Sequence, residues 1–418
     1  MRILVLDGNE NQAVAAARSL SIAGHVVAVG AHTSWSKAGW SRACRSTFTY
    51  AAPQHDADGF VEGIVEEAER EQGTLVLPMT ERTTLPLSAQ RERIFKAGGR
   101  LVLPPHETVL RAFDKQQTTR LAASLGVRVP RTQLVGDRVE AQQVARSISF
   151  PAVLKPRASE EVNAHGNTIA TGPPVYARDA EEFLAAYEHL SGRALSVLAQ
   201  EFVEGTGVGY FALMHAGELR AEFAHRRIRD VRPTGSGSSV RESIRPDPAL
   251  REAALSILRA LQWHGVAMVE FRVRADGTPV FLEVNGRFWN SLPLAVYAGV
   301  DFPGLMARMV LRDDVEQQAP GYRVGVRCRW LLGDFRHLLE VWRGAPNEYP
   351  GAYPPRLAAL KDFLVPVRGT FHDNFMLSDP LPELGDWLDF ALRRLPAGWR
   401  KRSAERKETD VQRGYSLS

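Results

Sequence analysis

The residues whose types and spacing carry the clearest chemistry are two glutamates in a predicted β-hairpin. β-rich runs at 266–274 and 279–285 flank Asp276-Gly277, a pair that is typical of a two-residue hairpin turn. If these two residues form the turn, Glu270 lies directly opposite Glu283. Facing carboxylates repel each other, and the apolar neighbours on both strands strengthen the repulsion. The pair therefore needs a compensating positive charge.

A bound divalent cation would supply that charge. Asn285 follows Glu283 by two positions, so period-2 geometry places its amide on the face of both carboxylates. Three oxygen donors without His or Cys suit a hard ion, which predicts Mg²⁺, with Mn²⁺ as a second candidate, at Glu270, Glu283 and Asn285. Arg287 can hold a phosphate or carboxylate oxygen beside the ion. The alternative is a hairpin whose glutamates reach solvent or an arginine such as Arg272 or Arg287.

Two lysines are notable because the chain uses arginine almost everywhere else: of its 52 lysines and arginines, seven are lysines. Lys155 ends a predicted strand and precedes a polar loop at 159–167. An ammonium at a strand end beside a flexible loop predicts a phosphate contact under a lid. Lys115 begins a predicted helix capped by Asp114, where a solvated side chain is the simpler interpretation. The loop has no GxxxxGK[ST] sequence, which disfavours a P-loop NTPase.

Two further segments are candidates for binding. Glu201, Phe202 and Val203 end an apolar run, and they can contact a ribose and an adenine edge, or equally form an edge strand that enters a turn. The segment 225–239 concentrates arginines before a Gly/Ser run, which predicts a mobile substrate loop. Its candidates for an anionic substrate group are Arg226, Arg227 and Arg229. A solvated charged face is the alternative for that segment.

Taken in order, these segments resemble the ATP-grasp superfamily, most closely its carbamoyl phosphate synthetase and biotin carboxylase branch. The resemblance covers roughly residues 1–310, and the Glu-x-Asn-x-Arg run at 283–287 is its most specific element. It implies an ADP-forming ligase that uses ATP and Mg²⁺ to activate a small-molecule carboxylate as an acyl phosphate and to join it to an amine. The lid departs from the usual glycine-rich form, since Gly166 is the only glycine in 159–167.

The resemblance also implies a role for each candidate residue. It assigns the ATP phosphates to Lys115 and Lys155, the ribose to Glu201, the adenine hinge to Phe202 and Val203, one or two Mg²⁺ ions to Glu270, Glu283 and Asn285, and the transferred phosphoryl group to Arg287.

Three other functions remain alternatives. The same fold could act on bicarbonate or carbamate, as a carboxylase or carbamoylating enzyme. An N-terminal βαβ unit would also fit a nicotinamide-dependent oxidoreductase, although the turn of this unit at 7–12 lacks GxGxxG. A binding protein without chemistry is a third alternative, and the facing carboxylates speak against it.

The element pattern and the resemblance together predict an α/β chain, α+β in its ATP-binding part. The expected domains are a Rossmann-like N-terminal domain with an open, mostly parallel sheet (1–110), an ATP-grasp domain (111–315) with a lid near 128–200 and the metal hairpin at 266–287, a C-terminal extension (316–396) and a disordered basic tail (397–418). Short apolar runs at 75–77 and 101–103 are expected strands of the first sheet, and 324–331 is an expected strand of the extension.

Composition narrows the protein class. The chain has 418 residues, 24% of them charged, and a net charge of +4, which excludes a disordered chain and gives little reason to expect a nucleic-acid partner. No apolar stretch at the N-terminus is long enough for a secretory or membrane segment, so we expect a cytoplasmic protein without a membrane partner. The two cysteines, Cys44 and Cys328, are expected to be reduced thiols. Oligomeric state is not predicted by the sequence.

Overall fold

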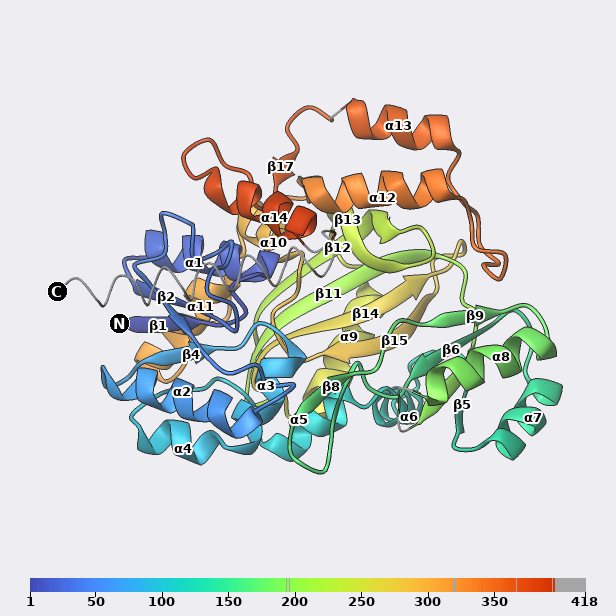
Figure 1. Cartoon of the computed structure of the whole chain (residues 1–418), viewed down its shortest axis with the longest axis horizontal. Coiled ribbons are helices and arrows are strands. Elements are labelled where there is room, and N and C mark those ends of the chain that lie inside the picture. Colours follow the sequence, from blue (N-terminus) through green and yellow to red (C-terminus); the bar gives the residue numbers. More distant parts are fainter. Residues whose placement is uncertain (193, 195, 319–320, 366, 393, 395–418) are drawn as a thin grey trace, which may run out of the picture.

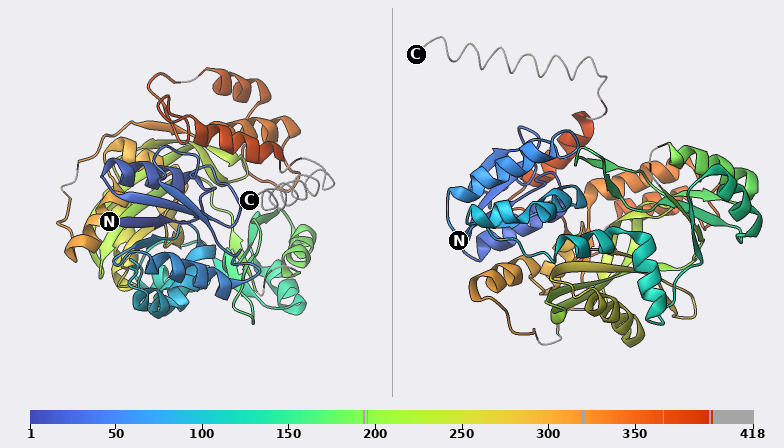
Figure 2. Two further views of the ribbon diagram at one scale, coloured as in Figure 1. Left: turned by 60° about the vertical axis from the view of Figure 1, so that its left-hand side comes forward. Right: turned by 90° about the horizontal axis from the view of Figure 1, so that it is seen from below.

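The computed structural model describes residues 1–192, 194, 196–318, 321–365, 367–392 and 394. It contains an N-terminal parallel sheet, a small antiparallel sheet, a long central sheet and a C-terminal group of helices (Figure 1). The N-terminal sheet and the small antiparallel sheet lie toward opposite ends of the long axis, with the central sheet between them (Figures 1 and 2). The predicted basic tail at 397–418 lies outside the described residues.

The N-terminal sheet is parallel, as predicted, with strand order β3-β2-β1-β4. Its strands and helices are β1 (Arg2–Val5), α1 (Asn11–Ile22), β2 (Val26–Ala31), β3 (Ser46–Thr49), α2 (Ala57–Glu69), β4 (Leu75–Leu77), α3 (Glu81–Ala89) and α4 (Arg91–Lys96). The predicted strand at 101–103 was wrong: only Arg100 makes an isolated bridge, to Leu75. The edge strand β3 was not predicted, because its four residues are largely exposed and form no apolar run.

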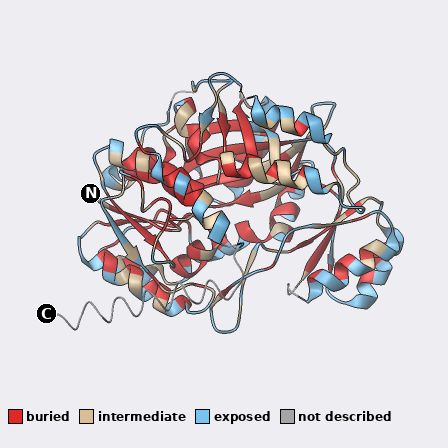
Figure 3. Ribbon diagram, turned by 45° about the horizontal axis from the view of Figure 1, so that its top comes forward, coloured by how far each residue is buried: buried red, intermediate tan, exposed pale blue. Residues whose placement is uncertain are grey.

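The small sheet is antiparallel, in the order β5-β10-β6-β9, and helices α7 and α8 pack on it. Its region comprises α5 (His106–Phe113), α6 (Lys115–Ser124), β5 (Thr132–Val135), α7 (Arg138–Ser147), β6 (Ala152–Pro156), β7 (Glu160–Val162), β8 (Thr168–Ala170), β9 (Val175–Ala177), α8 (Ala180–Ser191) and β10 (Val197–Glu201). The helices of this lobe expose their outer faces (Figure 3). The predicted cap of α6 is confirmed, since the Asp114 carboxylate accepts hydrogen bonds from the backbone N–H groups of Gln116 and Gln117.

The central sheet has the order β15-β14-β11-β12-β13-β16-β17 and is antiparallel except for its last pair. Its region comprises β11 (Thr206–His215), β12 (Glu218–Arg232), β13 (Ser236–Ser243), α9 (Pro248–Ala260), β14 (Gly265–Val273), β15 (Pro279–Asn285), β16 (Arg327–Arg329) and β17 (Phe371–His372). The predicted strand at 324–331 is thus shorter than expected.

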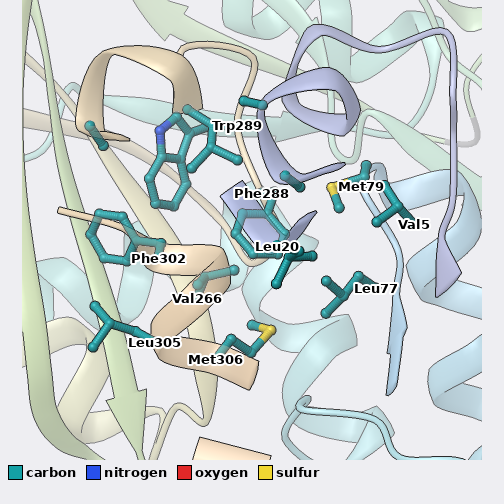
Figure 4. Close-up of a cluster of buried hydrophobic side chains, with 14 of the residues drawn as sticks. Val5, Leu20, Leu77, Met79, Val266, Phe288, Trp289, Phe302, Leu305 and Met306 are labelled. Carbon is teal, nitrogen blue, oxygen red and sulfur yellow. The ribbon is translucent and has the colours of Figure 1, made fainter. Parts of the chain in front are cut away.

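Alternating side chains of the central sheet enter two separate cores. Tyr210 and Val269 pack on one side with α9, whereas Phe211 and Met268 pack on the other side with the N-terminal sheet. Figure 4 shows the second core, in which Phe288 lies beside Leu20 of α1, and Leu77 of β4 belongs to the same cluster. This shared core joins the N-terminal domain to the hairpin strands.

The remaining helices are α10 (Leu292–Ala298), α11 (Phe302–Arg312), α12 (Leu331–Arg343), α13 (Arg356–Leu364) and α14 (Leu381–Leu392). Helices α12, α13 and α14 lie along one edge of the molecule, at the top of Figure 1. Buried ion pairs connect this segment to the rest of the chain: Arg18 with Asp379, Lys37 with Asp386 and Arg241 with Asp373. Within the described residues, no single helix has the length and hydropathy of a membrane span, although the bent pair α10 and α11 reaches both together.

Candidate nucleotide and metal site

The hairpin of β14 and β15 places Glu270 opposite Glu283, as predicted, but its loop differs from the predicted one. The loop is closed by hydrogen bonds between Arg274 and Thr278 and between Gly277 and Arg274, so it holds three residues rather than two. Gly277 has φ +83°, the left-handed conformation that such a loop requires at this position. The one-residue offset is cancelled by a bulge at Leu282. The predicted turn was therefore wrong and the predicted glutamate pairing was right.

Basic and amide groups from several elements surround the two carboxylates. Arg227 on β12 lies 2.8 Å from Glu270 Oε2, and Lys115 Nζ lies 3.7 Å from Glu283 Oε2. Asn285 Nδ2 donates to Glu283 Oε1 at 3.1 Å. The alternative considered from the sequence, a glutamate paired with an arginine, is thus found at Glu270. The arginine lies 43 positions away on another strand rather than in the hairpin itself.

Arg287 connects the hairpin to the N-terminal domain. Its Nη2 donates to Asn285 Oδ1 at 2.9 Å and lies 3.6 Å from Glu81 Oε1 on α3. Burial raises the pKa of the Glu81 carboxyl, and the nearby Arg287 opposes that rise. The sequence analysis missed Glu81, because its helix carries no pattern that points to the hairpin.

Burial and neighbouring charges shift the pKa values of the two glutamates in opposite directions. Burial raises the pKa of Glu270, with Arg227 acting in the opposite direction. Burial by itself would also raise the pKa of Glu283. The positive charges of Lys115 and Lys155 outweigh burial, so the pKa of this carboxyl is lowered. Burial lowers the pKa of Lys155 to about 8, and the nearby Glu283 only partly offsets this effect. The lysine is buried beside an anion, so a further anion would stabilise its charged form.

A cavity of about 390 Å³ lies between the small sheet and the hairpin. Its lining includes eight of the predicted site residues: Lys115, Lys155, Glu201, Phe202, Val203, Arg227, Glu270 and Glu283. Asn285 and Arg287 stand behind Glu283 through the hydrogen bonds described above. The volume is that of a small-molecule site, and the residues come from both sheets that border it.

The segment at 225–239 was predicted to be a mobile loop, and this was wrong. It forms the end of β12 and the start of β13, which pair with each other. Arg226 pairs with Glu242 at 2.6 Å and Arg229 with Asp334 at 2.8 Å, and neither lines the cavity. Arg227 alone of the three reaches the cavity, so its substrate role stays a prediction that now competes with its contact to Glu270.

Two aromatic rings pack against Phe202, which lines the cavity together with Tyr176. Tyr176 on β9 and Tyr349, from the segment between α12 and α13, lie 5.9 Å and 6.3 Å from the Phe202 ring, centroid to centroid. The two tyrosine rings lie 5.2 Å apart. Glu201 lies 3.3 Å from Arg274 of the hairpin loop. Tyr349 was missed because it is 147 positions from Phe202 and nothing in its proline-rich surroundings indicates the contact.

The polar segment at 159–167 forms part of a short hairpin, β7 with β8. Ser159 Oγ accepts a hydrogen bond from Lys115 Nζ at 2.8 Å. Glu160 pairs with Arg82 at 3.0 Å, and Asn167 accepts from the N-terminal residue of α2. The hairpin therefore bridges the cavity and the N-terminal domain.

Comparison with known proteins agrees with this fold. Residues 197–333 match a family model described as ATP-grasp in the biosynthetic pathway with Ter operon. A D-alanine–D-alanine ligase of Nitrosospira multiformis is 29% identical over 217 residues, 48% of this chain and 66% of that protein. The N-terminal section of the carbamoyl phosphate synthase large chain of Methanopyrus kandleri is 28% identical over 51% of this chain and 39% of that protein. The match thus spans less than two thirds of either relative.

Solved structures share the fold at low sequence identity. The biotin carboxylase domain of Hydrogenobacter thermophilus 2-oxoglutarate carboxylase, in complex with MgADP, ADP and bicarbonate, superposes with a TM-score of 0.61 at 15% identity, over 78% of this chain and 73% of that chain. The L-amino acid ligase of Bacillus licheniformis gives a TM-score of 0.55 at 15% identity, over 75% and 74%.

The chain therefore has the ATP-grasp fold and carries an ATP-grasp domain. The predicted resemblance to the carbamoyl phosphate synthetase and biotin carboxylase branch is confirmed, and D-alanine–D-alanine ligases stand beside that branch. The oxidoreductase alternative finds no support in these matches. In the turn after β1, the buried Asp7 carboxylate accepts hydrogen bonds from Met79, Thr80 and Thr83, where a nicotinamide site would need room for a pyrophosphate.

Proposed function

We propose that this protein is an ADP-forming ligase that activates a small-molecule carboxylate with ATP and joins it to an amine. The observation that carries the proposal is the pair of facing carboxylates, Glu270 and Glu283, in the lining of a cavity that Lys115 and Lys155 also line. Acids and lysines around one cavity are what a magnesium triphosphate needs, because the ion binds the carboxylates and the phosphates bind the ammonium groups.

In this proposal ATP occupies the cavity of about 390 Å³. Phe202 and Val203 would contact the adenine, with Tyr176 and Tyr349 closing the aromatic side. Glu201 would bind the ribose, and this requires it to leave Arg274 or to share its carboxylate with it. Lys155, whose charge is disfavoured by burial, would regain a stable charge beside the phosphates. Similar structures include one that holds MgADP, which supports nucleotide binding by a protein of this fold.

The residues of the hairpin fit a hard divalent cation. Glu270 and Glu283 offer carboxylate oxygens from two adjacent strands, without His or Cys, and Asn285 would add its amide oxygen by turning it away from Arg287. Arg227 favours the charged form of Glu270, whereas Lys115 and Lys155 favour that of Glu283, and the charge on Glu283 raises the pKa of Glu270. Bound Mg²⁺ would neutralise charge on the phosphate oxygens during transfer, and Arg227 would then be free to turn toward a substrate anion.

The chain's own groups support an in-line transfer. A substrate carboxylate oxygen forms a bond to the γ-phosphorus while the bond to the β-phosphate oxygen breaks, giving ADP and an acyl phosphate. Lys155 and Arg287 stabilise the charge that develops on the transferred group. An amine nitrogen then bonds to the carbonyl carbon, inorganic phosphate leaves with the bonding electrons, and the amine loses a proton. No residue of the protein forms a covalent intermediate in this scheme.

A second candidate keeps the first step and changes the acceptor. Bicarbonate in place of an organic acid would give a carboxylase-like enzyme, and one similar structure contains bicarbonate. The two candidates differ in their products, since amide formation leaves a product that is one water lighter than the sum of its two substrates. The cytoplasm is the compartment that we propose, because it provides ATP and keeps Cys44 and Cys328 reduced.

The test is ADP release from MgATP in the presence of paired amino acids, with mass spectrometry of each reaction that releases ADP. We expect ADP release that depends on both partners and a product whose mass lacks one water. ADP release that requires only bicarbonate would favour the second candidate. An absence of nucleotide binding in the presence of Mg²⁺ would refute both.

A further inference from the structure

A second cavity, of about 310 Å³, lies where the N-terminal domain, the end of the hairpin segment and the C-terminal helices meet. The turn after β1, Asn290 and helices α12 and α14 all contribute to its wall. The cavity is electrostatically linked to the hairpin, because Arg287 acts on the carboxyl of Glu10, which lines it.

One charged pair in this cavity is already satisfied within the protein. Lys37 Nζ lies 2.9 Å from Asp386 Oδ1 and also donates to Asn11. The second oxygen of Asp386 accepts from the Trp330 indole and from the Asn374 amide. Both charged side chains of the pair are nearly inaccessible, with 5% and 8% of their surface exposed. This network holds α14 against the N-terminal domain and leaves its own members little capacity for a ligand.

Two other charges in the cavity have no such partner. Within the described part of the chain, neither the Glu10 carboxylate nor the Arg336 guanidinium makes a hydrogen bond or an ion pair, although both are half-buried. Arg394 lies beside them with its guanidinium 3.5 Å from the centre of the Phe390 ring. A half-buried charge without a partner costs free energy, so a complementary ligand charge at either place would be favourable.

The two charges without a partner have opposite signs and come from different parts of the chain, the turn after β1 and helix α12. Glu10 lies within electrostatic range of Lys37 and Arg287, toward the reaction centre. Arg336 lies within range of Arg394 and Arg232. On the same side of the cavity, Asp386 is paired with Lys37 and Asp389 has an interaction of its own, so the charges left there for a ligand are those of the two arginines. A ligand that carries a positive and a negative group would match the cavity in one orientation.

Building on the proposed ligation, we propose that this cavity binds the amine substrate, and that this substrate also carries an anionic group. Its ammonium group lies against Glu10, and its anionic group lies against Arg336 and Arg394. The volume is about ten times that of a water molecule in the liquid, which suits a molecule of amino-acid size. Helices α12 and α14 of the C-terminal extension would thereby help to determine which amine substrate binds.

The test measures binding directly on the full chain, without relying on turnover. The probes are the proteinogenic amino acids in both enantiomers, titrated one at a time by calorimetry and by saturation-transfer NMR. For each binder, the α-carboxamide and the N-acetyl derivative remove one charge each. Phosphoethanolamine presents a phosphate in place of the carboxylate and so shows which anion the basic end prefers. We expect at least one probe to bind, and its two derivatives to bind at least about tenfold more weakly.

The variants assign the binding to this cavity. We expect Arg336→Gln to weaken the probe by at least about tenfold and Arg336→Lys to recover part of the loss. Arg343→Gln is the matched control, because Arg343 lies on the same helix with 63% of its side chain exposed, and it should bind as wild type. Glu10→Gln tests the opposite end independently and should remove the discrimination against the N-acetyl derivative.

Several outcomes would overturn the inference: no probe binding to wild type at about 10 mM, binding of the carboxamide and N-acetyl derivatives as tight as that of the parent amino acid, or unchanged binding in both Arg336→Gln and Glu10→Gln. MgATP titration of the same proteins keeps the two proposals distinguishable. If MgATP binds and the amine probes do not, this inference fails alone. If the probes bind as expected and MgATP does not, the proposed ligation fails and the cavity remains a binding site.

Discussion

Lys155 provides the sharpest quantitative prediction, because it is buried, with 8% of its surface exposed, and its pKa is about 8 in the nucleotide-free protein. A displacement from the ordinary value of 10.5 corresponds to about 3 kcal/mol of free energy that opposes the charged form. A triphosphate beside the ammonium should restore the charge. Binding of nucleotide above pH 8 should therefore take up a proton.

The expected uptake follows from the titration curve. At pH 9 a group with a pKa near 8 is roughly 90% deprotonated, so binding should take up about 0.9 proton, whereas at pH 7 the uptake should be about 0.1. The nucleotide phosphates are fully ionised at pH 9, so they contribute no protons of their own. The assay is calorimetric titration with Mg²⁺ and a non-hydrolysable ATP analogue in two buffers that differ in ionisation enthalpy.

The controls assign the proton to one side chain. Lys155→Met should abolish the uptake at pH 9 while reducing nucleotide affinity, and Lys96→Met should behave as wild type, because Lys96 is an exposed lysine on α4. Uptake below about 0.2 proton in wild type at pH 9, or equal uptake in Lys155→Met, would refute the assignment of Lys155 to the phosphates.

Four further predictions follow from the same contacts. Because the folded state lowers the pKa of Lys155, the unfolded chain holds more protons between pH 8 and 10.5; Lys155→Met should therefore raise the free energy of unfolding in urea at pH 7 by up to about 3 kcal/mol, with the gain fading as pH rises through that window. Glu283→Gln should reduce ADP formation at least about 1000-fold with an unchanged circular dichroism spectrum, and activity above a tenth of wild type would exclude it from the metal site. Arg227→Ala should lower kcat about tenfold and lower the Mg²⁺ concentration needed for half-maximal rate, because the ion no longer has to displace an arginine from Glu270, whereas Arg226→Ala, outside the cavity, should change neither by more than about twofold. Tyr349→Ala should raise the KM for ATP roughly three- to tenfold at unchanged kcat, and an unchanged KM would remove the C-terminal segment from the adenine side.

The hairpin illustrates what the sequence could predict. Glu270 and Glu283 were paired correctly because cross-strand register depends on local spacing and on alternation along each strand. The loop type and the bulge at Leu282 could not be predicted, because two-residue and three-residue loops share the Asp-Gly signal. The three-residue loop and the bulge shift the strand register in opposite directions, so their effects cancel at Glu270 and Glu283. The buried faces of both strands require this register.

The contacts that complete the site could not be predicted in the same way. Arg227 was expected in a mobile loop, because a Gly/Ser run follows it, but the run is the second strand of a pair. Tyr349 and Glu81 reach the site through tertiary packing and carry no local pattern. Local rules thus found the residues that share a strand or follow one, and missed those that the fold brings in from elsewhere.

The most direct measurement of the central claim is a crystal structure with Mg²⁺ and a non-hydrolysable ATP analogue. We predict an ion between Glu270 and Glu283, with metal–oxygen distances of about 2.1 Å to the carboxylates and to phosphate oxygens. Lys155 should contact the phosphates, and Arg227 should have moved away from Glu270. Nucleotide bound elsewhere, or an intact contact between Arg227 and Glu270 with no ion beside Glu283, would contradict the account.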